Sequence, residues 1–194
     1  MKTMKKILMM AACLLVTIVA KAGQPEITLT QLLQLERTHK PQVVLKKVNV
    51  RKLYLQVETS EQPFQCLYGR NVAWSEPFAG MKMLSHDALG VCYVDAGSGG
   101  WMLLTDHKEW LPYYLKEARK LGFYPSDSGY PADDNGNVVP HKQRQVKWWD
   151  VTDENDKVIG RSTELTVYYK DGSEHSFIIY DYADHLQITL GWAF

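Results

Sequence analysis

Residues 90–107, GVCYVDAGSGGWMLLTDH, contain side chains that a thiol hydrolase would need. Cys92 offers a nucleophile, His107 a general base, and the glycine-rich segment 96–100 offers backbone amides for an anion. A reactive cysteine needs a lowered pKa, but Cys92 lies in an apolar run, where burial raises the pKa of a thiol. The glycines also lack the spacing of a phosphate-binding or dinucleotide-binding loop. We therefore interpret the segment as two strands around a turn and expect no catalytic residue.

The histidines do not follow the spacing of a metal site. No two of them are four residues apart, and there is no Cys-x-x-Cys pair. Asp181, Asp184 and His185 form the densest group of ligand types, but they fall where two expected strands meet, and aspartate is common in turns. We expect no metal and no cofactor.

The N-terminus has the pattern of a secretory signal peptide. Lysines at positions 2, 5 and 6 precede an uncharged run over 7–19 and the small-residue exit Ala20-Lys21-Ala22. That run is shorter than the roughly 20 apolar residues that span a bilayer. We expect cleavage after Ala22 and export to the periplasm or the medium. The alternative is a lipid anchor at Cys13, but cleavage there would leave apolar residues 14–19 on the mature protein.

The charge balance gives no reason to expect a nucleic-acid partner. The chain has 194 residues, with 22 basic and 22 acidic side chains, and four lysines leave with the signal peptide, so the mature chain carries a net charge of −4. Nucleic acids and anionic membrane surfaces attract clustered Lys and Arg instead. The remaining length, 23–194, suits a single domain or two small halves that meet near 97–106.

Cys66 and Cys92 are the two cysteines that remain after signal cleavage. Thiols of exported proteins tend to pair, and a bridge closing a loop of this size would stabilise the fold by roughly 3 kcal/mol. We therefore expect a Cys66–Cys92 disulfide. Two buried free thiols are the alternative, because Cys92 belongs to a strand-like apolar run.

Two segments have helical periodicity. Leucines at near-helical spacing predict a short helix over 29–38, with Thr28 or Thr30 as its cap. A longer apolar stripe predicts the main helix over 106–121, capped by Thr105 or Asp106 and ended by Gly122. Pro112 either kinks this helix or marks its first turn.

Most of the remaining chain has the alternation of strands. Strands are predicted over 46–58, 66–74, 90–94 and 101–104, whereas 81–89 fits a brief helix or irregular chain. After a long loop at 124–140, four strands follow over 145–151, 158–170, 173–182 and 186–192. The fold class is therefore α+β, with a C-terminal antiparallel meander packed on one main helix.

A candidate binding patch follows from the turn Asp171-Gly172. A two-residue hairpin loop there would place Tyr168, Phe177 and Ile179 together among polar residues on one face of the sheet. Three large apolar groups on a polar face need a cover. The cover is either another part of this chain or a partner, for which the three residues would be the apolar centre.

Two function classes fit these features, and a third has less support from the residues. The absence of a recognisable catalytic constellation favours an exported protein that binds another protein, as an inhibitor or a protective partner. Glycan binding is an alternative because Trp148 and Trp149 could stack on sugar rings, although adjacent strand residues face opposite ways. An envelope hydrolase is supported only by aromatic and acidic side chains.

Overall fold

The computed structural model describes residues 24–57, 63–75, 80–94 and 99–191. The expected signal peptide at 1–22, with Cys13, lies outside these ranges. Within them, no helix is long and apolar enough to cross a membrane.

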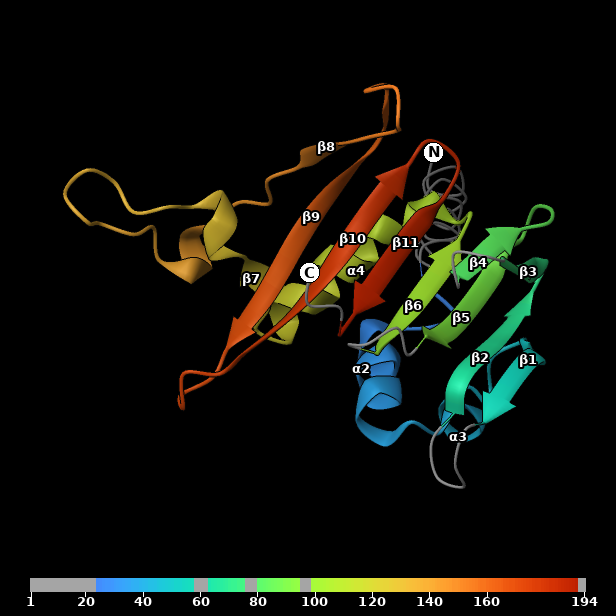
Figure 1. Ribbon diagram of the computed structural model, residues 1–194. Coiled ribbons are helices and arrows are strands. Elements are labelled where there is room, and N and C mark those ends of the chain that lie inside the picture. The colour runs from blue at the N-terminus through green and yellow to red at the C-terminus, as the bar shows by residue number, and fades with distance from the viewer. Residues whose placement is uncertain (1–23, 58–62, 76–79, 95–98, 192–194) are drawn as a thin grey trace, which may run out of the picture.

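The described residues form an α+β structure with one large antiparallel sheet, which confirms the expected class (Figure 1). The α-helices of this part of the chain are α2 (Leu29–Thr38), α3 (Pro41–Val44) and α4 (Leu111–Lys120). The strands of its first half are β1 (Arg51–Val57), β2 (Pro63–Arg70), β3 (Val72–Ser75), β4 (Gly80–Met83), β5 (Leu89–Val94) and β6 (Gly100–Thr105). Those of its second half are β7 (Tyr124–Pro125), β8 (Trp149–Thr152), β9 (Val158–Tyr168), β10 (Glu174–Tyr182) and β11 (Leu186–Leu190).

The order of elements repeats in the two halves of the chain. The large sheet runs β1-β2-β5-β6-β11-β10-β9, and both β7 and β8 pair with β9 at the far edge. Each half therefore starts with a helix, continues with an outer strand and proceeds inward, and the last strands of the halves, β6 and β11, pair at the centre. In Figure 1 the first half runs inward from cyan β1 to yellow-green β6, and the second half runs inward from orange β9 to dark red β11.

One face of the sheet is covered by α2 and α4, and the main core lies between them and the strands. The main core is one apolar cluster. It contains the buried leucines of α2, Tyr114 and Ala118 of α4, and strand residues such as Leu103, Ile188 and Phe177.

The predicted bounds of α2 are confirmed. Thr28 is the N-cap of this helix. Its hydroxyl accepts from the Gln31 backbone amide, and the Gln31 side-chain oxygen accepts from the Thr28 backbone amide.

Helix α4 starts later than the sequence predicts. Residues Lys108–Trp110 form a 3-10 turn, η1, and the α-helix begins only at Leu111, with Pro112 in its first turn. Asp106 does not cap this helix, because its carboxylate accepts from the backbone amides of Asp87 and Ala88. The proline therefore marks the true first turn and does not kink a longer helix.

The opposite face of the first half is covered by the small β3–β4 hairpin, whose second strand replaces the irregular chain or brief helix predicted there. The hairpin packs on Leu67, Cys92 and Met102, which form a second core cluster. Two glycines facing each other across the β2–β5 ladder, Gly69 and Gly90, leave room for Val72 and Met81 of the hairpin.

The expected disulfide is wrong, since Cys66 and Cys92 are both buried free thiols. The two cysteines lie on neighbouring strands, where Cys66 pairs with Tyr93 and Cys92 with Leu67. Residues one position apart in register point to opposite faces of a sheet. Cys66 accordingly lies in the helix-side core and Cys92 in the hairpin-side core, and their side chains cannot meet.

Candidate functional site

The hairpin between β9 and β10 decides which residues of the second half face outward. Tyr168 pairs with Glu174, one residue away from the register predicted for a two-residue loop. The Tyr169 amide donates to the Ser173 carbonyl and the Gly172 amide to the Tyr169 carbonyl, so three residues, Lys170 to Gly172, form the loop. Gly172 has a φ of +85°, which a residue with a side chain rarely adopts. The expected register is therefore wrong by one residue.

This shift moves two of the predicted patch residues into the core. Phe177 and Ile179 are 1% and 0% exposed and pack in the helix-side cluster, where the Phe177 ring meets Phe123 edge-on. Tyr168 stays on the other face, stacked on His141 with ring centroids 4.1 Å apart. Phe177 and Ile179 therefore do not belong to a surface patch.

The two predicted tryptophans lie on opposite sides of the sheet, as adjacent strand residues must. Trp148 packs against the helix-side core, and its outer face carries the Arg161 guanidinium 4.4 Å from the ring centroid. Trp149 is 39% exposed, pairs with Ser162 and lies beside Gly129. The tryptophans therefore do not form a joint platform for a sugar.

The face of the second half that points away from α2 and α4 carries a different apolar group. Ile178, Tyr180 and Tyr182 alternate with the buried residues of β10, are partly buried, and belong to neither core cluster. We call this surface the open face. Its centre on β9, β10 and β11 consists of the partly exposed residues Ser162, Glu164, Ser176, Ile178, Tyr180, Tyr182 and Gln187. Thr166 and Thr189 lie on the same face but are buried, and the pair Tyr168–Glu174 lies at its end.

Two rings of the open face and the ring of His185, which follows β10, form a stack. Tyr180 and Tyr182 are nearly parallel, with centroids 5.9 Å apart, and His185 continues the stack at 4.5 Å from Tyr182. Partial burial raises the pKa of both tyrosines, so their hydroxyls remain protonated donors at neutral pH. Glu164, opposite Ile178, is the one carboxylate in the centre of the open face. The surface combines an apolar centre with hydroxyl, amide and carboxylate groups.

A segment between β7 and β8 borders the open face and is fixed by Arg144. The Arg144 side chain is fully buried, donates to the carbonyls of Pro125 and Val139, and contacts the Asp127 carboxylate at 2.6 Å. The Asp127 amide in turn donates to the Tyr168 hydroxyl. Arg144 therefore holds the long loop that the sequence predicts at 124–140 against the end of β9.

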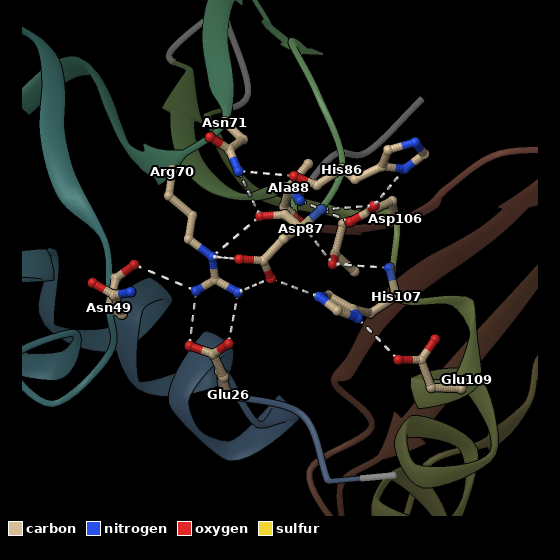
Figure 2. Close-up of polar contacts among 11 residues, drawn as sticks. Glu26, Asn49, Arg70, Asn71, His86, Asp87, Ala88, Asp106, His107 and Glu109 are labelled. Carbon is tan, nitrogen blue, oxygen red and sulfur yellow. Dashed lines mark hydrogen bonds and ion pairs between the residues drawn. The ribbon is translucent and has the colours of Figure 1, made fainter. Parts of the chain in front are cut away.

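A second polar site lies on the helix side, where the N-terminal segment meets the starts of β5 and α4 (Figure 2). Arg70, at the end of β2, donates to both carboxylate oxygens of Glu26 at 2.6 and 2.8 Å and to both oxygens of Asp87 at 2.7 and 3.0 Å. His107 continues the network. Its ring nitrogens lie 3.0 Å from Asp87 and 2.9 Å from Glu109. The hydrogen bonds of Arg70 and His107 lower the pKa of Asp87.

This network joins segments that are far apart in sequence, and every charged group that composes it has a partner. His107 has no nitrogen left to act as a base or a metal ligand, because both are bound to carboxylates. No group of three or more potential metal-binding side chains occurs in the described ranges. Arg70, Glu26 and Asp87 were not predicted as a group, because no local spacing connects residues on three separate segments.

The thiols provide no catalytic nucleophile either. Burial raises the pKa of Cys66 to about 12, and it raises the pKa of Cys92 as well. Both therefore remain neutral thiols at physiological pH. A shallow pocket between α2 and α4 contains Glu117, but this carboxylate is used to accept from the amides of Leu29 and Thr30 at the start of α2.

Comparison of the chain with protein-family models, with characterised proteins and with solved structures finds no match of any of the three kinds.

Proposed function

We propose that this chain is an exported, non-catalytic protein that binds a protein partner through the open face, as an inhibitor or a protective partner. The observation that carries the proposal is the group Ile178, Tyr180 and Tyr182, which packs in neither core cluster. The corresponding face of the first half is covered by the chain's own β3–β4 hairpin. Large apolar side chains without such a cover are typical of protein interfaces.

The composition of the open face supports a protein partner more than a glycan. Tyrosine is a frequent centre of protein interfaces because a rigid ring supplies contact area and its hydroxyl a hydrogen bond. A tyrosine that binds a sugar offers the flat side of its ring to it. Here Tyr182 is stacked on Tyr180 and on His185, so its ring is less available to a sugar than that of an isolated tyrosine.

The partner expected from this surface has three chemical features. It has an apolar centre to cover Ile178 and the tyrosine edges. It has hydrogen-bonding groups for the hydroxyls of the β9 and β10 residues that border this centre. It also places a Lys or Arg beside Glu164, since a carboxylate buried in an interface without a cation is costly.

The test replaces Tyr180 with a photoreactive amino acid in the protein expressed in its native host. We expect irradiation to crosslink a specific protein. The same residue placed at position 169 is the control, because Tyr169 is 45% exposed at the hairpin and lies outside the open face. The crosslinked protein is identified, purified and titrated against the chain.

Binding by the purified partner is then compared in Tyr180→Ala and Tyr169→Ala. We expect a 10-fold or greater loss of affinity for Tyr180→Ala only, since central interface tyrosines cost about 2 kcal/mol when truncated. Equal affinity of both variants, or crosslinks from position 169 alone, would refute the open face as the binding surface. If an oligosaccharide column retains the unaltered chain but not Tyr180→Ala, the open face binds a glycan and not a protein.

A further inference from the structure

The environment of His107 requires a protonated ring. A neutral imidazole has one N–H donor and one nitrogen that can only accept. In the structure both ring nitrogens lie within hydrogen-bond distance of carboxylate oxygens, Nε2 of Asp87 and Nδ1 of Glu109. Carboxylates only accept, so one of these two contacts is repulsive whenever the ring is neutral. The two contacts can exist together only with an imidazolium.

The other charges around His107 favour the same state. Asp106, at the end of β6, adds a third negative charge, and the Trp110 ring stacks on the imidazole at 4.4 Å. Partial burial lowers the pKa of His107, but the hydrogen bonds to Asp87 and Glu109 outweigh it and hold the pKa above its ordinary value. The charged or titratable groups that face this site, directly or through one neighbour, are Asp87 and His86 before β5, Asp106 directly after β6, Glu109 on η1, Arg70 on β2 and Glu26 before α2.

The two carboxylates bound to His107 differ in what else holds them. Asp87 also accepts two hydrogen bonds from Arg70. For Glu109, which is 54% exposed, His107 is the one side-chain partner that the described residues provide. When the ring loses a proton, the better-anchored Asp87 keeps the remaining N–H, and Glu109 is the group that is released.

We propose that His107 is a pH-dependent lock, which in its protonated form fastens η1 and the start of α4 to the Arg70 network and on deprotonation releases Glu109 and loosens η1. The lock lies on the helix side of the sheet, so it does not depend on the open face or on the proposed binding function. Its contribution to stability is complete below the ordinary histidine pKa of about 6.5. This contribution disappears as the pH rises through the higher pKa of the folded state.

The test is an NMR titration of the folded, ¹⁵N-labelled protein between pH 5 and 9. We expect the His107 ring to titrate above 6.5 and to keep its proton on Nε2 at high pH. The amide signals of Lys108–Trp110 should move with the same midpoint. Titration at or below 6.5, a neutral ring with its proton on Nδ1, or amide signals that do not follow the ring would overturn the proposal.

Glu109→Gln is the decisive variant. The side-chain amide that this substitution introduces can donate to a neutral Nδ1, so the ring no longer needs its second proton. We expect the titration midpoint of His107 to fall and the pH-dependent movement of the η1 amides to disappear. The matched control is His86→Gln, at a fully exposed histidine 3.9 Å from Asp106, which should leave both unchanged. An unchanged His107 midpoint in Glu109→Gln would refute the lock.

Discussion

Gly69 and Gly90 make room for the β3–β4 hairpin, and their replacement by alanine has different expected costs. A Cβ on Gly69 would stand 2.7 Å from the carbonyl oxygen of Leu89 and would overlap the Val72 side chain. A Cβ on Gly90 would meet the Met81 sulfur at 2.6 Å and Val72 Cγ2 at 3.0 Å, a contact that a shift of the valine by a few tenths of an ångström relieves. The backbone oxygen and the branched valine cannot move away easily, whereas the end of a methionine side chain can.

The magnitudes follow from this difference. Overpacking of a core costs about 1–3 kcal/mol, and alanine regains about 0.5–1 kcal/mol over glycine in a strand. We expect Gly69→Ala to lower the free energy of unfolding by about 2 kcal/mol net, and Gly90→Ala to change it by less than about 1 kcal/mol. With a urea dependence of about 2 kcal/mol per M, the Gly69→Ala midpoint should fall by about 1 M.

The assay is equilibrium unfolding in urea, followed by circular dichroism, for both single variants and for Gly69→Ala combined with Val72→Ala. Removal of the valine methyl groups relieves one of the two overlaps, so the double variant should be more stable than the sum of the single effects predicts, by about 1 kcal/mol. Equal costs for the two glycines, or strict additivity with Val72→Ala, would refute the close approach of the hairpin.

Three further measurements test the core, the thiols and the Asp127 contact. Phe177→Ala should lower the free energy of unfolding by about 3–5 kcal/mol, because it empties a fully buried ring site, and a loss below about 1 kcal/mol would contradict the observed register. Cys66 and Cys92 should react with iodoacetamide only after unfolding, since burial raises both thiol pKa values, and a reductant should not change the melting temperature. Partial burial raises the pKa of Asp127, but Arg144 outweighs this and the net pKa is lowered. Its stabilising contribution is therefore present above the ordinary pKa of about 3.9 and lost as the pH falls, so Asp127→Asn should flatten the acid side of the stability profile.

Regular local patterns made much of the fold predictable. The leucine spacing and Thr28 located α2, short apolar runs located β5 and β6, and alternation located most of the C-terminal meander. The start of α4 was not predictable from local rules, because Asp106 has the chemistry of a helix cap but binds the chain before β5 instead. A capping residue indicates a helix start only when no other segment offers it amides.

The candidate site was less predictable because it depends on one residue of register. Asp-Gly is compatible with a two-residue loop and with the three-residue loop that the structure contains. The choice between them exchanges the faces of β10, so it decides whether Phe177 or Ile178 points outward. The Tyr180–Tyr182–His185 stack follows only from the observed register.

The two halves of the sheet differ in how their outer faces are built, and this difference restricts how a partner can bind. In the first half the facing glycines let the β3–β4 hairpin approach the backbone of β2 and β5. In the second half, Glu164 and Ile178 stand opposite each other on β9 and β10, next to Tyr180. A partner at the open face must therefore contact side chains and cannot pack as closely on the strands as the hairpin does. Its affinity depends on shape complementarity to Ile178 and the tyrosines, so substitutions there should change binding without the loss of stability expected at Gly69.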